Sequence, residues 1–479
     1  MSLSLAFSTA RSSLMATATQ IEASTRNVGN AGDPNSSRKI AVTTTMGSGG
    51  AYVVQISRAS DTALYTRMVS ATSDTARAQA MQGGLDQLQS LVGDPTSAQS
   101  AAALLGTFTS SLSNYRNSPE EGSVGTALVV AAKNLTSALN SAAAGVNTVR
   151  QDADEAMAES VTRVNDLLRQ FGEQNEAVVR GTNSGADVTD ALDKRDAILS
   201  QLSEEMGIST VTRPGNDMVI YTDSGATLFE TTARTVTFQP TSNYSAGVTG
   251  KSVYVDGVAV AGPDATMTLK SGNLAGLAEL RDQTSLTYQN QIDEIARALV
   301  GSFMESDPTG TLPDAQGLFT ATNLSDPGAA ARLTVNAAVD PSQGGSATLI
   351  RDGGINGTAY VQNAEGGESY SGWLASLSTN LSAGRTFSTA GGIPTSATLA
   401  DYSTSSVGWL SGQRQSWTTE ATSQSSLLAH ASTALSNATG INLDDEYVYQ
   451  LELEKTYQAS SKLLSIVNQL YDTLLEITR

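Results

Sequence analysis

Both ends of this 479-residue chain carry the same apolar spacing. Residues recur at alternating steps of four and three, which is the 3.5-residue period of helices that wrap around one another. The N-terminal stripe is Leu3, Phe7, Ala10, Leu14, Thr17, Ile21, Ser24 and Val28, and the C-terminal stripe is Leu453, Tyr457, Ser460, Leu464, Val467, Tyr471 and Leu474. The spacing predicts two amphipathic helices that pack antiparallel on each other and on adjoining subunits.

The composition argues against several classes of function. The chain carries 28 Lys and Arg against 47 Asp and Glu, for a formal net charge of -19. A uniformly acidic surface repels phosphate, so nucleic acids and anionic membranes are not expected partners. There is no cysteine, which removes disulfides, thiolate nucleophiles and cysteine-ligated metals. A single histidine, His430, and an aromatic share of 5% leave little for imidazole chemistry or a deep aromatic pocket.

The first residues do not resemble a secretory signal peptide. Met1–Ser13 has no basic segment before an unbroken apolar core, and Arg11 falls where apolar residues should continue. The longest apolar run, 127–132, is far shorter than the roughly 18 residues of a membrane span. We therefore expect neither Sec export nor a membrane helix, while export by machinery that reads disordered termini stays open.

The hydrophobic period predicts the secondary structure. Period-two alternation indicates β structure over 208–270, where Asp256-Gly257 between two apolar runs is the strongest hairpin signal. Residues 38–58 are expected to form a loop or a β-hairpin, and strand-like pieces occur at 333–335 and 348–350. The spacing predicts helices over 2–29, 62–92, 97–117, 123–181, 187–206, 273–305, 407–437 and 443–479.

The expected fold is mainly α with inserted β modules. The length favours two to four domains rather than one core. We assign terminal helices in an inner coiled-coil domain to 1–38 and 441–479, an α-helical bundle body to 39–207, 271–305 and 406–440, a β module to 208–270, and a β or loop-rich outer module to 306–405.

Three clusters of charged residues are candidates for a metal site or a catalytic site. Asp444–Glu446 suits the dipole of a helix start better than a metal, and Asp352–Gly357 is more typical of a turn than of a calcium loop. Asp193, Arg195 and Asp196 imitate a catalytic cluster, but on one helical turn they are expected to form surface ion pairs. Further i,i+4 pairs are expected at Glu159/Arg163, Glu176/Arg180 and Asp293/Arg297. We therefore expect no catalytic residue, no cofactor and no metal.

Three groups of motifs carry a family resemblance. They are Gly440–Glu446 with Tyr457–Ser460 and Leu470–Leu475; Leu192–Asp196 with Leu202 and Gly207; and Ser271–Gly276 with Glu279–Gln283 and Asp293–Leu299. The first group is similar to the tail shared by axial proteins of the bacterial rod, hook and junctions. The other two resemble segments specific to the flagellar hook-associated protein 1 family, which forms the first junction between hook and filament. The resemblance covers about half of the chain.

The resemblance implies a structural subunit with no catalysis. Copies would form a ring in a hollow tube, with the hook protein below and the second junction protein above. The family reaches its extracellular site unfolded through the flagellar type III export channel, and a cytoplasmic chaperone holds the C-terminal helix before export. The expected assembly interface is Leu3, Phe7, Leu14, Ile21, Val28, Leu453, Tyr457, Leu464, Val467, Tyr471 and Leu474.

One segment departs from the family pattern. Axial proteins carry an Asn-x-x-Asn turn followed by Gly-Tyr-x-Arg after the first helix. Here Asn27-Val-Gly-Asn30 matches, but Pro34–Ser37 replaces the Gly-Tyr. The alternatives are the second hook–filament junction protein or a flagellin-like filament subunit, which lack the 192–196 and 271–299 patterns. A secreted glycan-active enzyme with two carboxylates is a remote alternative, because few aromatics are present for sugar stacking.

Overall fold

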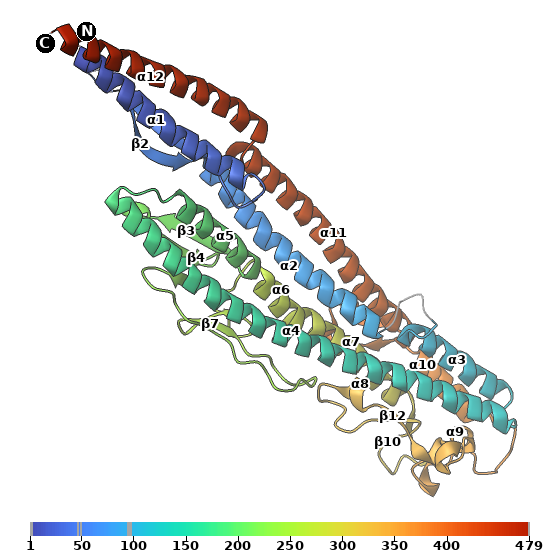
Figure 1. The fold of residues 1–479 in the computed structure, drawn as a ribbon. Helices are drawn as coiled ribbons and strands as arrows, with labels where there is room; N and C mark the ends of the chain where they lie inside the picture. The colour runs from blue at the N-terminus through green and yellow to red at the C-terminus, as the bar shows by residue number, and fades with distance from the viewer. Residues whose placement is uncertain (1–2, 46, 48–49, 93–97, 478–479) are drawn as a thin grey trace.

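The molecule is a long rod with both chain ends at the same end (Figure 1). The computed structural model describes residues 3–45, 47, 50–92 and 98–477. We call the end that holds both termini the tip, formed by α1, the segment 31–38, β1, β2 and α12, and the remainder the body. The expected fold class, mainly α with small inserted β modules, is confirmed.

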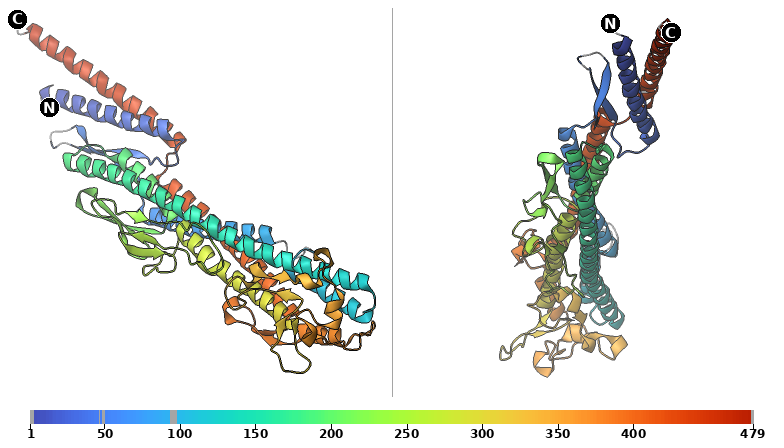
Figure 2. Two further views of the ribbon diagram at one scale, coloured as in Figure 1. Left: turned by 90° about the horizontal axis from the view of Figure 1, so that it is seen from below. Right: turned by 60° about the vertical axis from the view of Figure 1, so that its left-hand side comes forward.

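The tip is built from two helices and one hairpin. Helix α1 spans Leu3–Asn30 and α12 spans Leu443–Ile477, and strands β1 (Lys39–Thr45) and β2 (Ala51–Arg58) pair antiparallel with a bulge after Val42. Helix α1 packs against α12 and also against both strands. In Figure 2 it lies between the hairpin and α12. The two predicted terminal helices are confirmed over the described residues. Of the loop or β-hairpin expected over 38–58, the structure has the hairpin.

The body is a bundle of long helices. The predicted helix boundaries are confirmed to within a few residues for most of them, although residues 93–97 lie outside the described part. The bundle helices are α2 (Thr62–Val92), α3 (Ala101–Asn117), α4 (Gly122–Ser184), α5 (Thr189–Glu205), α6 (Asn273–Glu279), α7 (Ser285–Ser302) and α11 (Leu399–Thr439). Helix α11 runs along α2, and α4 packs on α3, α5, α6 and α7. A π-helical turn, Leu280–Thr284, joins α6 to α7 and interrupts the single helix expected over 273–305.

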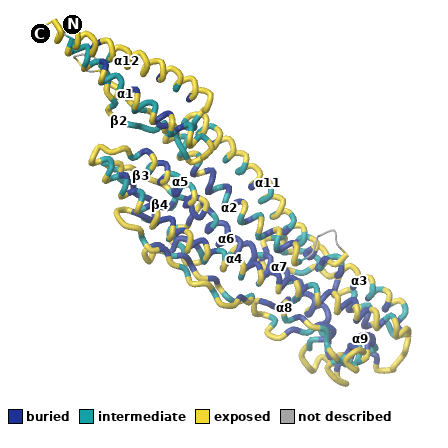
Figure 3. The backbone as a smooth tube through the Cα atoms, viewed as in Figure 1, coloured by how far each residue is buried: buried dark blue, intermediate teal, exposed yellow. Residues whose placement is uncertain are grey.

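The main hydrophobic core lies entirely in the body. Residues of α2, α3, α4 and α7 form its largest part, and the rings of Phe108, Phe303 and Phe319 meet edge to face at 5.3–5.4 Å. Among the described residues, no side chain of α1 or α12 belongs to this core. Figure 3 shows the contrast, with dark buried residues along the body and mostly exposed or half-buried residues on the tip.

The β module expected over 208–270 forms two small antiparallel sheets beside α4. One contains β3 (Ile208–Thr212), β4 (Met218–Thr222) and β5 (Thr227–Phe229), and the other contains β6 (Val236–Thr237), β7 (Val253–Val255) and β8 (Val258–Ala261). The hairpin predicted at Asp256-Gly257 joins β7 to β8. Both turn residues have positive φ, 49° and 84°, as a two-residue type I′ turn requires.

The region 306–405 is loop-rich, and its strands are only two residues long. The strand expected at 348–350 is wrong, because Thr348–Asp352 forms helix α9, whereas the strand expected at 333–335 is confirmed as β12. The remaining elements are β9 (Met304–Glu305), β10 (Ala315–Gln316), β11 (Phe319–Thr320), α8 (Ala329–Arg332), β12 (Thr334–Val335), α10 (Gly372–Ser382), β13 (Arg385–Thr386) and β14 (Ser396–Ala397).

At the family-like stretch Ser271–Gly276, the start of α6 lies in close contact with α2 and with the end of α5. Gly272 precedes α6 with φ of 90°, and a Cβ there would lie 2.3 Å from the Cα of Met206 at the end of α5. A Cβ on Gly276 would lie 2.6 Å from the carbonyl oxygen of Arg77 on α2. The hydroxyl of Ser271 lies within hydrogen-bonding distance, 3.0 Å, of both the Asp223 carboxylate and the Ser73 hydroxyl. The motif is therefore explained by backbone packing.

Candidate assembly interface at the paired chain ends

The two terminal helices pack antiparallel along their apolar stripes. Near the outer end, the rings of Phe7 and Tyr471 meet edge to face with centroids 6.4 Å apart. Near the body, Ser24 Oγ donates to the Glu446 carboxylate at 2.6 Å. These two contacts lie at opposite ends of one continuous seam, so the stripes predicted from the sequence meet each other within a single chain (Figure 1).

Small residues close the seam, and the larger predicted residues flank it. Ala10, Thr17, Ser24 and Ser460 are buried. Of the predicted interface residues, Leu453 and Val467 are buried, Tyr457 and Leu474 are 39% and 53% exposed, and the half-buried ones are Leu3, Phe7, Leu14, Ile21, Val28, Leu464 and Tyr471. Much of the predicted set is thus used inside the chain, and its role between subunits stays a prediction.

The hairpin covers a second face of α1. Buried Ala16, Ala23 and Asn27 each precede a stripe residue by one position, which rotates them by about 100° around the helix. Gly50 at the start of β2 lies against Thr9 and Ser12 of α1. Helix α1 therefore buries two faces, one against α12 and one against the hairpin. The sequence pattern predicts only the face against α12.

Asn27 joins three elements of the tip. Its amide nitrogen donates to the Glu446 carboxylate at 3.0 Å and to the Lys39 carbonyl at 2.9 Å, and its amide oxygen accepts from the Lys39 backbone N–H at 2.7 Å. Asn27 is 2% exposed and Glu446 is 5% exposed. The acidic helix start expected at Asp444–Glu446 is confirmed, and within it Glu446 is also a buried acceptor, whereas Asp444 and Asp445 are exposed. The sequence signal for this buried contact was Asn27 itself, because it is the first residue of the turn motif that matches the family.

A row of ion pairs connects the tip to the body. We call this set the joint, and it consists of Arg26, Lys39 and Arg58 on the tip and Asp187, Asp190, Asp193 and Asp196 around the start of α5. Arg58 lies 2.9 Å from Asp193 and 2.6 Å from Asp196, and Lys39 pairs with Asp193. The carboxylates recur every three residues along the chain. All of the tip's charged partners in this set are cations and all of the body's are anions.

The joint corrects the expectation of surface ion pairs at 193–196. Asp193 is 7% exposed and Arg195 is 3% exposed. Asp193 accepts from Ser37, Lys39 and Arg58, which the chain brings from a distant segment. Arg195 points the other way and donates to the Asn175 side chain and the Asn216 carbonyl, at 3.0 Å and 2.6 Å. The partners lie on other elements, so helical spacing within 193–196 did not reveal the burial.

Burial and pairing act differently on the joint's carboxylates. Burial alone would raise the pKa of Asp193, but hydrogen bonds from Lys39, Ser37 and Arg58 outweigh it and hold that pKa below its usual value. Burial raises the pKa of Asp196 in spite of Arg58 beside it. The pKa of Asp187 is lowered, because the hydrogen bond from Arg26 and those from Thr189 outweigh the burial. Asp193 is therefore held firmly in its charged form.

The other charged clusters are structural. The pairs Glu159/Arg163 and Glu176/Arg180 are confirmed at 3.7 Å and 3.2 Å. The pair Asp293/Arg297 is wrong, because buried Asp293 accepts from the N–H groups of Gly328 and Ala330 while Arg297 pairs with Glu294. Asp352 accepts from Arg351 and Asn363. Within the described ranges, no three His, Asp or Glu side chains are arranged to hold a metal ion.

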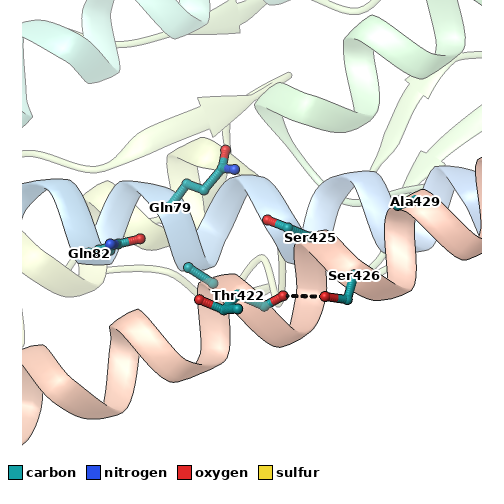
Figure 4. A pocket seen from close by; sticks show the side chains of 7 residues that line it. Gln79, Gln82, Thr422, Ser425, Ser426 and Ala429 are labelled. Carbon is teal, nitrogen blue, oxygen red and sulfur yellow. Dashed lines mark hydrogen bonds between the residues drawn. The ribbon is translucent and has the colours of Figure 1, made fainter.

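A shallow groove of about 420 Å³ lies between α2 and α11 (Figure 4). Its lining offers amide, hydroxyl and methyl groups, and Ser426 Oγ is already engaged with the Thr422 carbonyl at 2.9 Å. The lining residues are Gln79, Gln82, Ala421, Thr422, Ser425, Ser426 and Ala429. Such a lining supplies no acid, base or activated nucleophile, so the groove has none of the groups that catalysis requires.

Comparisons with known proteins match the body. The family model described as "Flagellar hook-associated protein FlgK helical domain" matches residues 85–318. Flagellar hook-associated protein 1 of Salmonella typhimurium is 25% identical over 268 residues, which cover 54% of this chain and 48% of that protein. The protein of the same name from Escherichia coli K12 is 23% identical over 274 residues, covering 56% and 49%. The chain thus matches about half the length of these relatives.

One solved structure that resembles this chain is the flagellar hook junction protein FlgK from Burkholderia pseudomallei. Its sequence is 21% identical, its TM-score is 0.43, and the match covers 53% of this chain and 46% of that one. Among the described residues, no helix is long and apolar enough to cross a membrane. The motifs at 192–196 and 271–299 lie inside the span that the family model matches. The sequence motifs and the family and relative matches agree that the body of this chain is similar to the helical domain of the flagellar hook-associated protein 1 family.

Proposed function

We propose that this protein is a structural subunit of the bacterial flagellum that forms the junction between hook and filament. The observation that carries the proposal is the tip, which pairs the two chain ends in a module outside the main core. The tip has little apolar packing of its own. Of the large apolar side chains on its two helices, only Leu453 and Val467 are buried. A module of this kind gains stability from neighbours.

The tip also exposes apolar side chains that neighbours can cover. On α12, Leu463, Ile466 and Leu470 are 56%, 45% and 47% exposed and each precedes a seam residue by one position. On the hairpin, the exposed apolar residues are Ile40, Val42, Tyr52 and Val54. Exposed apolar groups gathered on one part of a surface are typical of interaction sites. Neither group belongs to the stripes predicted from the sequence, and we add both to the proposed assembly interface.

The partners follow from the family. Copies of this chain form a ring, with the hook protein below and the second junction protein above. The chain is exported to the extracellular flagellum, and a cytoplasmic chaperone holds α12 before export. The domain division stays a proposal: an inner domain of terminal helices, a helical body and two outer modules. We propose no catalysis, in line with the hydroxyl-lined and amide-lined groove between α2 and α11.

Removal of α12 tests the proposal. A chain lacking residues 443–479 is expressed in cells that have lost their own copy, and filaments attached to hooks are counted by electron microscopy. We expect bare hooks, because α1 loses its seam partner and the exposed residues of α12 are gone. The full-length chain expressed in the same way is the control and should restore filaments. Normal filament numbers with the shortened chain would refute the role of the paired ends.

A further inference from the structure

The joint has a buried part and an exposed part. Lys39 and Asp193 have side chains that are 1% and 9% exposed, and Arg58 beside them is 16% exposed. Arg26 pairs with Asp187 at 2.6 Å and with Asp190 at 2.8 Å, and these side chains are 28%, 27% and 58% exposed. Exposed pairs are weakened by salt, whereas buried pairs are screened much less. The two parts therefore respond differently to their surroundings.

Two stretches of chain and a set of polar contacts join the tip to the body. The chain crosses between them at 59–61, from β2 into α2, and at 440–442, from α11 into α12. Besides these crossings, the Arg38 N–H donates to the Thr439 carbonyl at 2.9 Å, and Ser37 donates to Asp193. The charged contacts of the joint add to these polar links between tip and body. Because the tip shares no part of the main core, these polar contacts hold its angle to the body.

We propose that the joint sets the angle of the tip, with the Lys39–Asp193–Arg58 cluster as a fixed pivot and the Arg26 pairs with Asp187 and Asp190 as a releasable latch. The closed latch holds α1 against the start of α5. Opening the latch breaks the two exposed ion pairs of Arg26. It leaves the Lys39 pairs with Asp193 and Asp190, the Arg58 pairs and both chain crossings intact. The tip then swings on the pivot without unfolding of the body. This inference concerns the isolated chain and does not rest on the proposed function.

The absence of cysteine makes the angle measurable, because introduced cysteines are the only thiols. Gln458→Cys on α12 and Gln170→Cys on α4 place one spin label on the tip and one on the body, both at exposed positions. The distance between the labels is measured by double electron–electron resonance in the full chain. At low salt we expect one narrow distance distribution for the closed latch.

Arg26→Gln opens the latch in this experiment. We expect a broader distribution, or a second distance, while the thermal unfolding of the body is unchanged. Molar salt should move the parent chain toward the distribution of Arg26→Gln, because it screens the exposed pairs. The matched control is Arg414→Gln, which removes the 2.6 Å pair with Asp86 between α11 and α2 inside the body. The control should leave the distribution narrow.

Asp193→Asn provides an independent test in the same distance measurement, because it weakens the pivot itself. We expect a distribution broader than that of Arg26→Gln. Circular dichroism of each variant shows whether the helices remain folded. An Arg26→Gln distribution identical to that of the parent chain, with the chain folded, would overturn the latch. A broadening of the same size in Arg414→Gln would overturn the assignment to the joint.

Discussion

Asp193 connects three segments of the chain that are distant in sequence. It accepts hydrogen bonds from Ser37, Lys39 and Arg58 while remaining 7% exposed. A buried charge is tolerated when it is paired and hydrogen-bonded, and removing one partner leaves the others uncompensated. Asp193 therefore specifies how the hairpin sits on α5. This role was not visible in the sequence, because its partners lie more than 130 positions away.

Asp193→Asn should lower the free energy of unfolding by about 3 kcal/mol at neutral pH, since Lys39 and Arg58 lose a buried counter-charge. The folded-state pKa of Asp193 is lowered, so its contribution is fully present above the unfolded-state pKa of about 3.9. It is lost as the pH falls through the folded-state pKa. Urea unfolding should thus show a gap between parent and variant at pH 7 that closes below about pH 4.

The control for this prediction is Asp86→Asn, whose side chain is 46% exposed and pairs with Arg414 outside the joint. It should cost less than about 1 kcal/mol, as exposed ion pairs do. An Asp193→Asn chain as stable as the parent chain at pH 7 would contradict the structural role given to the joint.

Gly272→Ala should lower the free energy of unfolding by about 2 kcal/mol or more. Its φ of 90° is strained for a side-chain residue, and the new Cβ would lie 2.3 Å from the Met206 backbone. Gly301→Ala on α7 is the matched control, because a Cβ there meets nothing within 4 Å. It should stabilise the helix by about 0.5–1 kcal/mol. A Gly272→Ala chain that unfolds at the same temperature as the parent chain and as Gly301→Ala would show that the 271–276 contact is not tight.

At the level of elements, helix boundaries with local signals could be predicted and others could not. Helix α2 begins and ends as expected: Asp61 caps it by accepting from the Leu64 N–H. Helix α11 begins eight residues earlier than expected, at Leu399. The signal was present in Thr398, whose hydroxyl accepts from the Asp401 N–H and donates to the Asp401 carboxylate.

Element 348–352 shows why the outer module was harder to predict. Thr348-Leu349-Ile350 contains β-branched residues, which favour a strand. The segment instead forms one helical turn, in which Ile350 and Arg351 are buried. Arg351 donates to the Pro119 and Glu368 carbonyls, contacts that lie outside the segment. Tertiary contacts decide short segments without a clear period. The seam at the chain ends was predictable because its period runs over many turns.

The two terminal helices should be the least stable long helices of the free chain. Their seam buries mostly small residues, and most helical stability in proteins comes from packing an amphipathic face. Hydrogen exchange of the purified monomer should therefore be faster in α1 and α12 than in α4 and α7. Protection of α1 and α12 should rise in assembled flagella. Exchange in the monomer as slow in α12 as in α7 would contradict a tip that depends on neighbours.

On the scale of the whole molecule, the rod separates two tasks. The body holds the main core and the β modules, and its sequence matches the family's helical domain. The tip pairs the chain ends and exposes apolar residues, and the joint fixes the tip to α5. This division fits a subunit that polymerises through one end while presenting its body outward.

Assembly through the tip is tested most directly by counting filaments per hook in cells whose only copy of this protein carries Leu463→Asp and Leu470→Asp. Both residues are about half exposed on α12, so the monomer should fold and appear in the medium. Ser465→Asp with Gln469→Asp adds the same charge to another exposed face of α12 and is the control. We predict bare hooks for the first variant and normal filaments for the second. Normal filaments in both would contradict assembly through the tip.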